Sequence, residues 1–433
     1  MKQSLPVLLV FFFSTVISGE DWPQWRGPNQ NGSSPEKKLP AEWNDEKNVV
    51  WKAQMPGYSA ATPVICKGRV FVSSGDSNMK LHAICLDEKT GEILWSRPAG
   101  KDCWFRGKRH NGASPSAVTD GKTVCFLFGT GPLLSFNFEG RQLWSRNFTE
   151  EYGPFCLMWG YGSSPLLLDG KLYIPILQNK TPGAYGEMDN RRAPLKSYLL
   201  ALNLEDGKTD WEHERKSDMR GETCESYITP MAMEQNGKNV ILVNAAEYLT
   251  GHLAETGEEL WRWRFSPSLD SRNQRTVSSI TVDGDVLFFG RPKCSLFYAV
   301  KPGDGKDVLS NDILQWKFSE SSSDATSPLL YGGRIYLLNG RGRDLSCLDP
   351  KSGKVYWSKS LEVRSDLRAS PTGADGKVYC LTMRGEAIVV EAADEYKVIA
   401  RNRMKETGCR ASIAIANGRL FIRTPGYVYC IGK

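Results

Sequence analysis

Short apolar runs separated by glycine turns recur along this chain. The segment LDEKTGEILW at residues 86–95 returns as LDPKSGKVYW at 348–357, and looser copies end at Trp144, Trp211 and Trp261. In all five copies a glycine stands four residues before the tryptophan. Because glycine adopts a positive φ at little cost, the pattern predicts a tight hairpin turn followed by a strand that ends in a large flat side chain.

Further strand signals precede each of these turns. Ser114-Pro115, Ser164-Pro165, Ser327-Pro328 and Ser370-Pro371 each lead into a glycine turn flanked by apolar residues. The repeated unit is therefore four short antiparallel strands, which predicts an all-β, eight-bladed β-propeller with four-stranded blades. The blades are expected to start near Ala61, Ala113, Ser163, Ile228, Val277, Thr326, Ala369 and Ala411.

The last repeat lacks its outer strand. Residues 411–431 hold only three strand signals, whereas residues 48–53 at the other end form an isolated strand that contains Trp51. Pairing of the two ends in one blade would remove an exposed sheet edge. We therefore expect a propeller over residues 48–433, closed by its terminal strands and preceded by an extension at 20–47.

Seven tryptophans at the ends of outer strands are expected to dock one blade on the next. A buried tryptophan removes on the order of 150–250 Å² from water, so this role needs no ligand. The seventh repeat has Val398-Ile399 instead of a tryptophan, and the fifth has a longer turn before its own. The docking residues are Trp51, Trp95, Trp144, Trp211, Trp261, Trp316 and Trp357.

The motif Asp-x-x-Thr-Gly-x-x-x-Trp, as in residues 87–95, resembles the tryptophan-docking motif of quinoprotein alcohol dehydrogenases. It is also similar to that of the non-catalytic propeller in the bacterial outer-membrane β-barrel assembly machine. The resemblance covers nearly all of residues 48–433. The opening DWPQWRGP at 21–28 is similar to the mature start of exported bacterial propellers with pyrroloquinoline-quinone-like repeats. These resemblances imply a fold, and function must be argued from the site.

Residues 1–19 have the layout of a secretory signal peptide: Lys2, an apolar run, then Ser18 and Gly19. We expect export to the periplasm or the medium as a monomer without a membrane span. The net charge is +6, but the basic residues are scattered, which argues against nucleic-acid binding.

Eleven cysteines are present, an odd number without a CxxC pair. Most lie in apolar strands and are expected to be buried thiols. Only Cys103 and Cys156 stand in loops, at corresponding places of neighbouring blades, so a disulfide between them is predicted.

The longest connections are expected on one face of the propeller, where binding usually occurs. They are residues 101–111, 150–161, 178–197, 216–226 and 267–275. Residues just before the inner strands should surround the axial opening and form a ligand site suited to an anionic ligand or a protein partner. The alternative is a water-filled channel whose charges satisfy one another. The set is Tyr58, Arg109, His110, Trp159, Tyr161, Glu225, Tyr227, Arg272, Arg275, Asp324, Arg368 and Arg410.

A quinone-dependent oxidoreductase is the alternative function. The resemblance to quinoprotein dehydrogenases implies pyrroloquinoline quinone (PQQ) held between a tryptophan and two adjacent cysteines, with calcium bound by carboxylates. This sequence has no adjacent cysteines and no CxxCH, and Glu225 and Asp324 are a weak calcium signal. Motifs of other common enzymes are missing as well, so a binding role without a cofactor, metal or catalytic residue is favoured.

Overall fold

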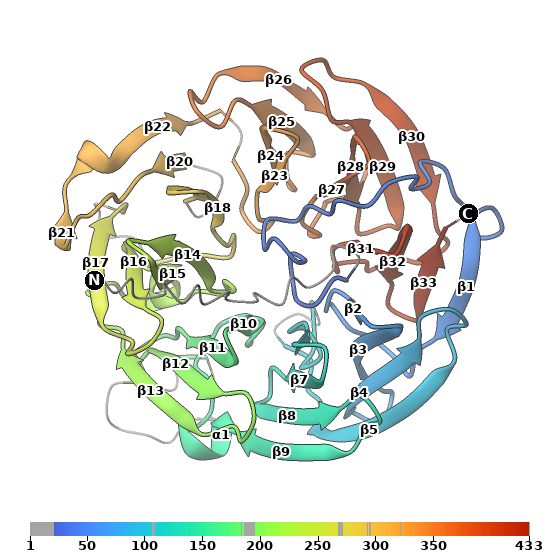
Figure 1. Cartoon of the computed structure of the whole chain (residues 1–433), viewed down its shortest axis with the longest axis horizontal. Helices are drawn as coiled ribbons and strands as arrows, with labels where there is room; N and C mark the ends of the chain where they lie inside the picture. The colour runs from blue at the N-terminus through green and yellow to red at the C-terminus, as the bar shows by residue number, and fades with distance from the viewer. Residues whose placement is uncertain are drawn as a thin grey trace, which may run out of the picture.

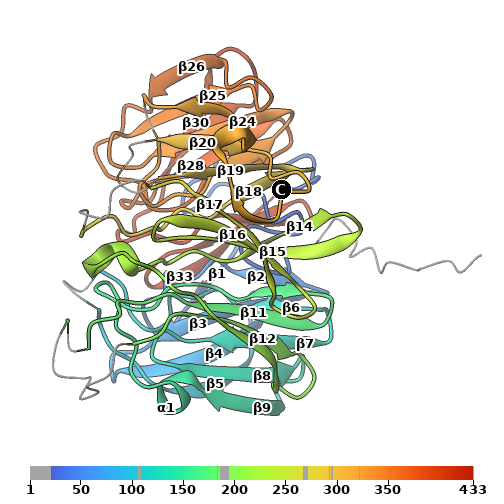
Figure 2. The ribbon, with the colours of Figure 1, turned by 90° about the vertical axis from the view of Figure 1, so that its left-hand side faces the viewer.

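Eight small antiparallel sheets are arranged in a ring, as the repeats predict (Figure 1). The computed structural model describes residues 21–105, 109–182, 184–185, 195–266, 272–291, 293, 296–320 and 322–432. The expected signal peptide at 1–19 lies outside these residues. Figure 2 shows the same disc from its side. Within the described ranges, no helix is long and apolar enough to cross a membrane.

The first four blades follow the predicted order of strands. In each, a short inner strand at the axis is followed by three strands that step outward. A one-turn helix α1 (Phe148–Glu151) leaves blade 2, and a 3-10 turn (Gly221–Cys224) precedes blade 4. The strands are β2 (Val64–Cys66), β3 (Arg69–Gly75), β4 (Lys80–Asp87) and β5 (Ile93–Lys101); β6 (Val118–Thr119), β7 (Thr123–Leu127), β8 (Pro132–Asn137) and β9 (Gln142–Asn147); β10 (Leu166–Leu168), β11 (Lys171–Ile176), β12 (Tyr198–Asn203) and β13 (Thr209–Glu214); and β14 (Met231–Gln235), β15 (Lys238–Ala245), β16 (Tyr248–Leu253) and β17 (Glu259–Arg264).

Blade 5 departs from the repeat. Its long turn forms β21 (Asp307–Leu309), which pairs in parallel with β17 and makes blade 4 five-stranded; a 3-10 turn (Asn311–Ile313) follows. The remaining strands are β18 (Thr281–Asp283), β19 (Val286–Gly290), β20 (Phe297–Val300) and β22 (Leu314–Phe318); β23 (Leu329–Tyr331), β24 (Arg334–Asn339), β25 (Asp344–Leu348) and β26 (Val355–Ser360); β27 (Thr372–Ala374), β28 (Lys377–Leu381), β29 (Glu386–Glu391) and β30 (Val398–Arg403); and β31 (Ala414–Ala416), β32 (Arg419–Arg423) and β33 (Tyr427–Ile431).

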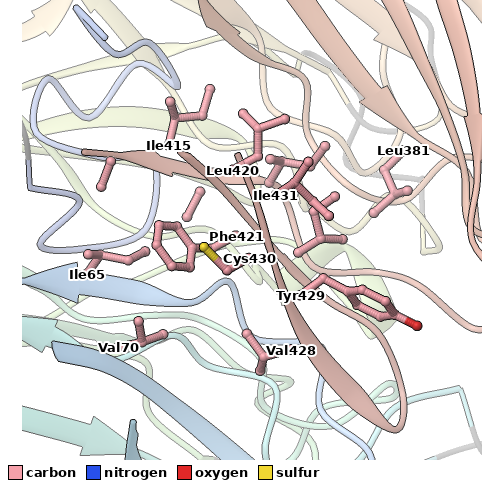
Figure 3. Packing of buried hydrophobic residues seen from close by; sticks show 14 of the residues in the cluster. Ile65, Val70, Leu381, Ile415, Leu420, Phe421, Val428, Tyr429, Cys430 and Ile431 are labelled. Atoms are coloured by element: carbon pink, nitrogen blue, oxygen red, sulfur yellow. The ribbon is translucent and has the colours of Figure 1, made fainter. Parts of the chain in front are cut away.

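The two ends of the chain close the ring in blade 8. Strand β1 (Val49–Gln54) pairs antiparallel with β33, with Trp51 opposite Cys430 and Gln54 opposite Tyr427. The prediction of closure by terminal strands is confirmed. Figure 3 shows the apolar packing around this blade. Phe421, Tyr429 and Cys430 are buried there in one cluster of hydrophobic side chains.

Six of the seven tryptophans dock in one common way. The indole nitrogen of each donates a hydrogen bond of 2.8–3.1 Å to a backbone carbonyl in the next blade. Five of the rings also lie against the turn glycine, as Trp95 lies against Gly140, at a distance that leaves no room for a Cβ. Trp261 is different: it bonds to Gln235 of its own blade, and Trp263 packs on Phe289 and Tyr298 of blade 5 instead.

A closed circle of hydrogen bonds joins the inner strands around the axis. In every blade, the N–H of a serine or threonine just before the inner strand donates to the side-chain hydroxyl of the matching residue in the next blade, at 2.9–3.2 Å. The eighth bond, from Ser412 to Thr62, returns to the first blade. The hydroxyl circle consists of Thr62, Ser116, Ser164, Thr229, Ser279, Ser327, Ser370 and Ser412.

The extension before β1 crosses the middle of the disc (Figure 1), at the ends of the inner strands that lie away from the predicted opening. Its backbone bonds to residues within or beside the inner strands of several blades: Trp22 pairs with Ile65, and the carbonyl of Pro23 accepts from Thr119. Arg26 is 2% exposed, and its guanidinium donates to the carbonyls of Pro328 and Pro371 at 2.5 and 2.7 Å. Burial lowers the pKa of Arg26 to about 9, so the side chain stays charged at neutral pH.

The extension also supplies an aromatic residue where the repeat lacks one. Trp43 is 3% exposed and lies 6.2 Å from Tyr379, ring to ring, in a cluster that includes residues of blades 7 and 8. Its backbone N–H donates to Asn402 of β30, the strand without a docking tryptophan. The sequence repeat does not show this contact, because Trp43 lies outside it.

Candidate functional site: an arginine-lined axial cup

The axis of the propeller holds a cavity of about 460 Å³, and the extension, which bonds to inner-strand residues of several blades, crosses one of its ends. Trp25 of the extension lies at its base, and residues of the hydroxyl circle, such as Thr62 and Ser116, line its wall. The opposite opening is lined by residues from the loops that precede the inner strands. We call this cavity the axial cup; the alternative of a water-filled channel whose charges satisfy one another stays a hypothesis beside it.

Seven of the twelve predicted ligand-site residues line the axial cup. They converge from six blades because each occupies a similar place, shortly before an inner strand. The seven are Arg109, His110, Trp159, Tyr227, Arg275, Arg368 and Arg410.

The other five predicted residues lie elsewhere. Tyr58 is next to the rim, where its ring lies 5.1 Å from Trp104 and its hydroxyl faces the carbonyl of Arg109 at 3.4 Å. Arg272 is exposed outside the cup. Tyr161 instead points into the core and donates to the carbonyl of Pro175, while Glu225 and Asp324 are buried behind the cup wall.

Two of the four arginines are already paired with carboxylates. Arg275 lies 3.4 Å from Glu222 and 3.3 Å from Asp324, and Arg368 lies 3.8 Å from Asp324 and 3.4 Å from Asp366. Asp324 is 3% exposed and also receives Arg341 at 3.3 Å. These ion pairs are partly shielded from water, so they hold the wall of the cup in place.

Arg109 and Arg410 differ from this pair. Among the described residues, no carboxylate lies within 4.0 Å of either guanidinium. Arg109 lies over the ring of Trp159, 4.5 Å from its centroid, and the indole N–H of Trp159 donates to Glu222 at 2.6 Å. This cation–π contact orients the Arg109 charge without neutralising it.

His110 adds no positive charge to the cup at neutral pH. Burial lowers its pKa to about 4, and its Nδ1 bonds to the hydroxyl of Ser114 at 2.8 Å. The formal charge of the lining therefore comes from the four arginines and Asp366. When Glu222 and Asp324 behind the wall are counted as well, four positive charges stand against three negative ones, which leaves an excess of one positive charge.

Glu225 supports the wall and does not face a ligand. It is fully buried, and its Oε2 accepts from the hydroxyl of Tyr227 at 2.5 Å and from the N–H of Met158 at 2.9 Å. Burial raises the pKa of this carboxyl to about 7, against the opposing effect of its hydrogen bonds.

The raised pKa of Glu225 predicts a pH dependence of stability. Folding favours the protonated form of Glu225. Its contribution to the free energy of unfolding is therefore fully present below about pH 4.3, the pKa in the unfolded chain, and is lost as the pH rises through about 7, the pKa in the folded protein. We expect the Glu225→Gln variant to lose less stability than the parent between pH 5 and 8 in urea unfolding. Glu92→Gln, an exposed site, should behave as the parent; equal slopes in all three proteins would contradict the assignment.

The rim is shaped by a short hairpin of blade 2. Trp104 and Asn111 form a β-bridge, and the buried carboxylate of Asp102 accepts from Cys103 N, Gly112 N and Asn111 Nδ2 at 2.6–2.8 Å. This anchoring presents Trp104, 40% exposed, to solvent beside the opening. Residues 106–108, and parts of the predicted loops at 178–197 and 267–275, lie outside the described residues.

The predicted disulfide between Cys103 and Cys156 is not formed, and both residues are free thiols. Each is held by its own local contacts: Cys103 belongs to the anchored hairpin, whereas the Cys156 N–H donates to Gln178 and its thiol to the carbonyl of Thr181. Corresponding places in two blades do not bring the sulfur atoms together, because the two loops fold differently.

The sequence reasoning missed the base and the wall of the cup. Trp25 lies in the segment whose resemblance was noted, but nothing in the repeat places it on the axis. The hydroxyl circle had a signal in the Ser-Pro pairs, yet in blade 2 the circle uses Ser116 and not Ser114. A search for Ser or Thr at the start of all eight repeats would have found it.

Eight blades in a ring, joined by docking tryptophans, define the chain as an eight-bladed β-propeller. Residues 38–154, 194–343 and 298–403 match the protein family described as outer membrane protein assembly factor BamB, and the chain belongs to this family. No curated protein matches the sequence.

Solved structures with the same fold include a BamB protein and several alcohol dehydrogenases. BamB from Moraxella catarrhalis aligns with a TM-score of 0.61 at 12% identity, over 88% of this chain and 99% of that one. Quinohemoprotein alcohol dehydrogenase from Comamonas testosteroni aligns at 0.67 and 14%, over 96% and 81%. A europium-containing methanol dehydrogenase aligns at 0.70 and 11%, over 94% and 91%. At these identities the likeness shows the fold alone.

Proposed function

We propose that this chain is an exported binding protein that holds an anionic group of a small ligand or of a protein partner in the axial cup. The observation that carries the proposal is the state of Arg109 and Arg410, which face the cavity without a carboxylate in reach. An anion with two or more oxygen atoms would accept hydrogen bonds from both guanidinium groups. Membership in the BamB family supports a binding role.

The volume of the cup limits the size of the ligand that it can hold. A cavity of about 460 Å³ lies within the range of small-molecule sites, and its hydroxyl-lined wall and aromatic base offer both polar and apolar contacts. A protein partner would insert an acidic side chain or chain end while its body rests on the looped face. The positive excess would also attract such groups from solution.

The residues do not fit PQQ bound as in the dehydrogenases. No adjacent cysteines exist, and Asp324, one of the two carboxylates considered for calcium, lies within 3.8 Å of three arginines. A divalent cation at Asp324 would have to share the carboxylate with these three positive charges, which is unfavourable. The donor set therefore does not support the dehydrogenase alternative, and we derive no reaction from it.

The test is calorimetric titration with matched acidic and neutral ligands, such as glucuronate against glucose and acidic against neutral peptides. The double variant Arg109→Gln with Arg410→Gln should weaken binding of the acidic ligands by at least about tenfold, since a hydrogen bond to a charged group contributes roughly 1.5–3 kcal/mol. Added salt should weaken it further.

The control is the pair Arg141→Gln with Lys351→Gln, which removes the same net charge from exposed turns far from the cup. It should bind as the parent does. The proposal fails if neutral ligands bind as tightly as acidic ones or if the control pair loses as much affinity. Changing Arg275 and Arg368 is less informative, because it would leave the buried Asp324 with fewer partners and weaken the fold.

A further inference from the structure

We propose a binding site for a divalent transition metal ion of the zinc class between blades 3 and 4, formed by His213, His252 and Glu259. Their potential ligand atoms all lie within 4.8 Å of one another. The site lies at the outer strands and shares no residue with the axial cup. It therefore does not depend on the function proposed above.

The fold brings the three side chains together from two blades. His213 belongs to β13 at the edge of blade 3, two residues after the docking Trp211. His252 and Glu259 are cross-strand partners on β16 and β17 of blade 4. The rings of His213 and His252 meet edge to face, with centroids 4.6 Å apart, and His213 Nε2 lies 3.6 Å from Glu259 Oε2.

The docking of blade 3 on blade 4 does not depend on these three side chains. Blade docking rests on Trp211, whose indole donates to the carbonyl of Ala254 at 3.0 Å. At 3.6 Å, the contact between His213 and Glu259 is longer than a hydrogen bond. A metal ion between them would make two short bonds in place of one long contact.

Two imidazoles and one carboxylate are a ligand set typical of zinc sites that keep one position for solvent. On the buried side of the cluster, His252 Nδ1 faces the carbonyl of Gly257 at 3.4 Å, and its Nε2 lies 2.9 Å from the hydroxyl of Thr250. A carbonyl on Nδ1 favours the tautomer whose Nε2 carries no proton, so an ion bound at Nε2 would take the place of the Thr250 hydroxyl. His213 is 26% exposed, which gives an ion access from solvent.

The surrounding charges determine which ions can bind. Arg262 donates to both carboxylate oxygens of Glu259, Nε to Oε1 and Nη2 to Oε2 at 2.9 Å. Arg215 lies buried nearby on the carbonyls of Ala245 and Tyr248. These guanidinium groups repel any cation, so only an ion that binds imidazole strongly gains enough to stay. Calcium and magnesium, which prefer oxygen ligands, do not fit.

An ion at this site would link blade 3 to blade 4. One ligand comes from β13 and two come from blade 4, so the bound ion would add a second contact beside the tryptophan dock. Because the ligands come together only in the folded chain, binding should raise the melting temperature in proportion to the logarithm of free metal concentration.

The experiment is a titration of the metal-free, reduced full chain with Co²⁺, followed by displacement with Zn²⁺. We expect one equivalent of Co²⁺ to give visible d–d bands without the near-ultraviolet band of a cobalt–thiolate bond, since the site has no sulfur. Zn²⁺ should remove the bands and raise the melting temperature. Ca²⁺ and Mg²⁺ should do neither.

The variants His213→Gln and Glu259→Gln should each weaken Co²⁺ binding by at least about tenfold, as loss of a metal ligand costs no less than loss of a group that orients one. The matched control is His82→Gln, another strand histidine that pairs with a carboxylate, Asp76 at 2.9 Å, but without a third ligand. The control should bind Co²⁺ as the parent does.

Three results would overturn the site. They are the absence of saturable binding near one equivalent, a thiolate band that assigns the ion to cysteines, and binding that survives His213→Gln or is lost in His82→Gln. His213 is partly exposed, so its glutamine variant should fold, and its melting temperature without metal gives the check.

Discussion

Removal of residues 21–54 should cause the chain to aggregate. The deletion takes away β1 and leaves one edge of β33 unpaired, and an exposed sheet edge is a template for pairing with other chains. It also removes Trp22, Arg26 and Trp43, all buried against the blades. Size-exclusion chromatography with light scattering measures the result.

A shorter deletion of residues 21–47 separates the two causes. It keeps β1 and its pairing with β33, so this protein should stay soluble while its melting temperature falls, because the contacts of Arg26 and Trp43 are lost. If the longer deletion behaves as the parent does, the pairing of β1 with β33 does not contribute to the stability of the ring.

The second large effect concerns a docking tryptophan. Trp357 is 6% exposed, its indole donates to Ala393 of blade 7 at 3.1 Å, and its ring lies 5.1 Å from Tyr396. Trp357→Ala should destabilise the protein by about 3–5 kcal/mol, the usual cost of emptying a buried aromatic site. Urea and thermal unfolding measure this change.

Trp104→Ala is the control for this prediction. Trp104 is 40% exposed at the rim and docks no blade, so its removal should leave the unfolding transition close to that of the parent. A loss at Trp104 as large as that at Trp357 would mean that position in the repeat does not decide the role of a tryptophan in this chain.

The blades could be predicted because their signals are local. A turn glycine four residues before a tryptophan, with apolar strands on both sides, determines a hairpin wherever it occurs. Trp51 then indicates where the missing strand belongs. Blade 5 shows the limit: its long turn has no repeat signal, so the pairing of β21 with β17 could not be seen.

The site was only partly predictable, because it is built by loops. The repeat gives the place of Arg109, Arg275, Arg368 and Arg410 around the axis, and all four line the cup. The repeat does not indicate the direction in which a side chain before a strand points. Tyr161 belongs to the same predicted set, but its side chain lies in the core. Pairing of Arg275 with two carboxylates depends on contacts between separate loops, which no pattern in one repeat contains.

The base formed by Trp25 has a kinetic consequence. With the extension across this end, the cavity exchanges its contents through the opposite opening, so water must leave by the route that a ligand uses to arrive. A polymer cannot thread through the disc and slide along it; only an end or a side branch can be admitted. Both the association and the dissociation of a ligand then depend on the rim, where Trp104 and Tyr58 lie. Substitutions at the rim would change the two rate constants together and leave the inner part of the cavity unchanged.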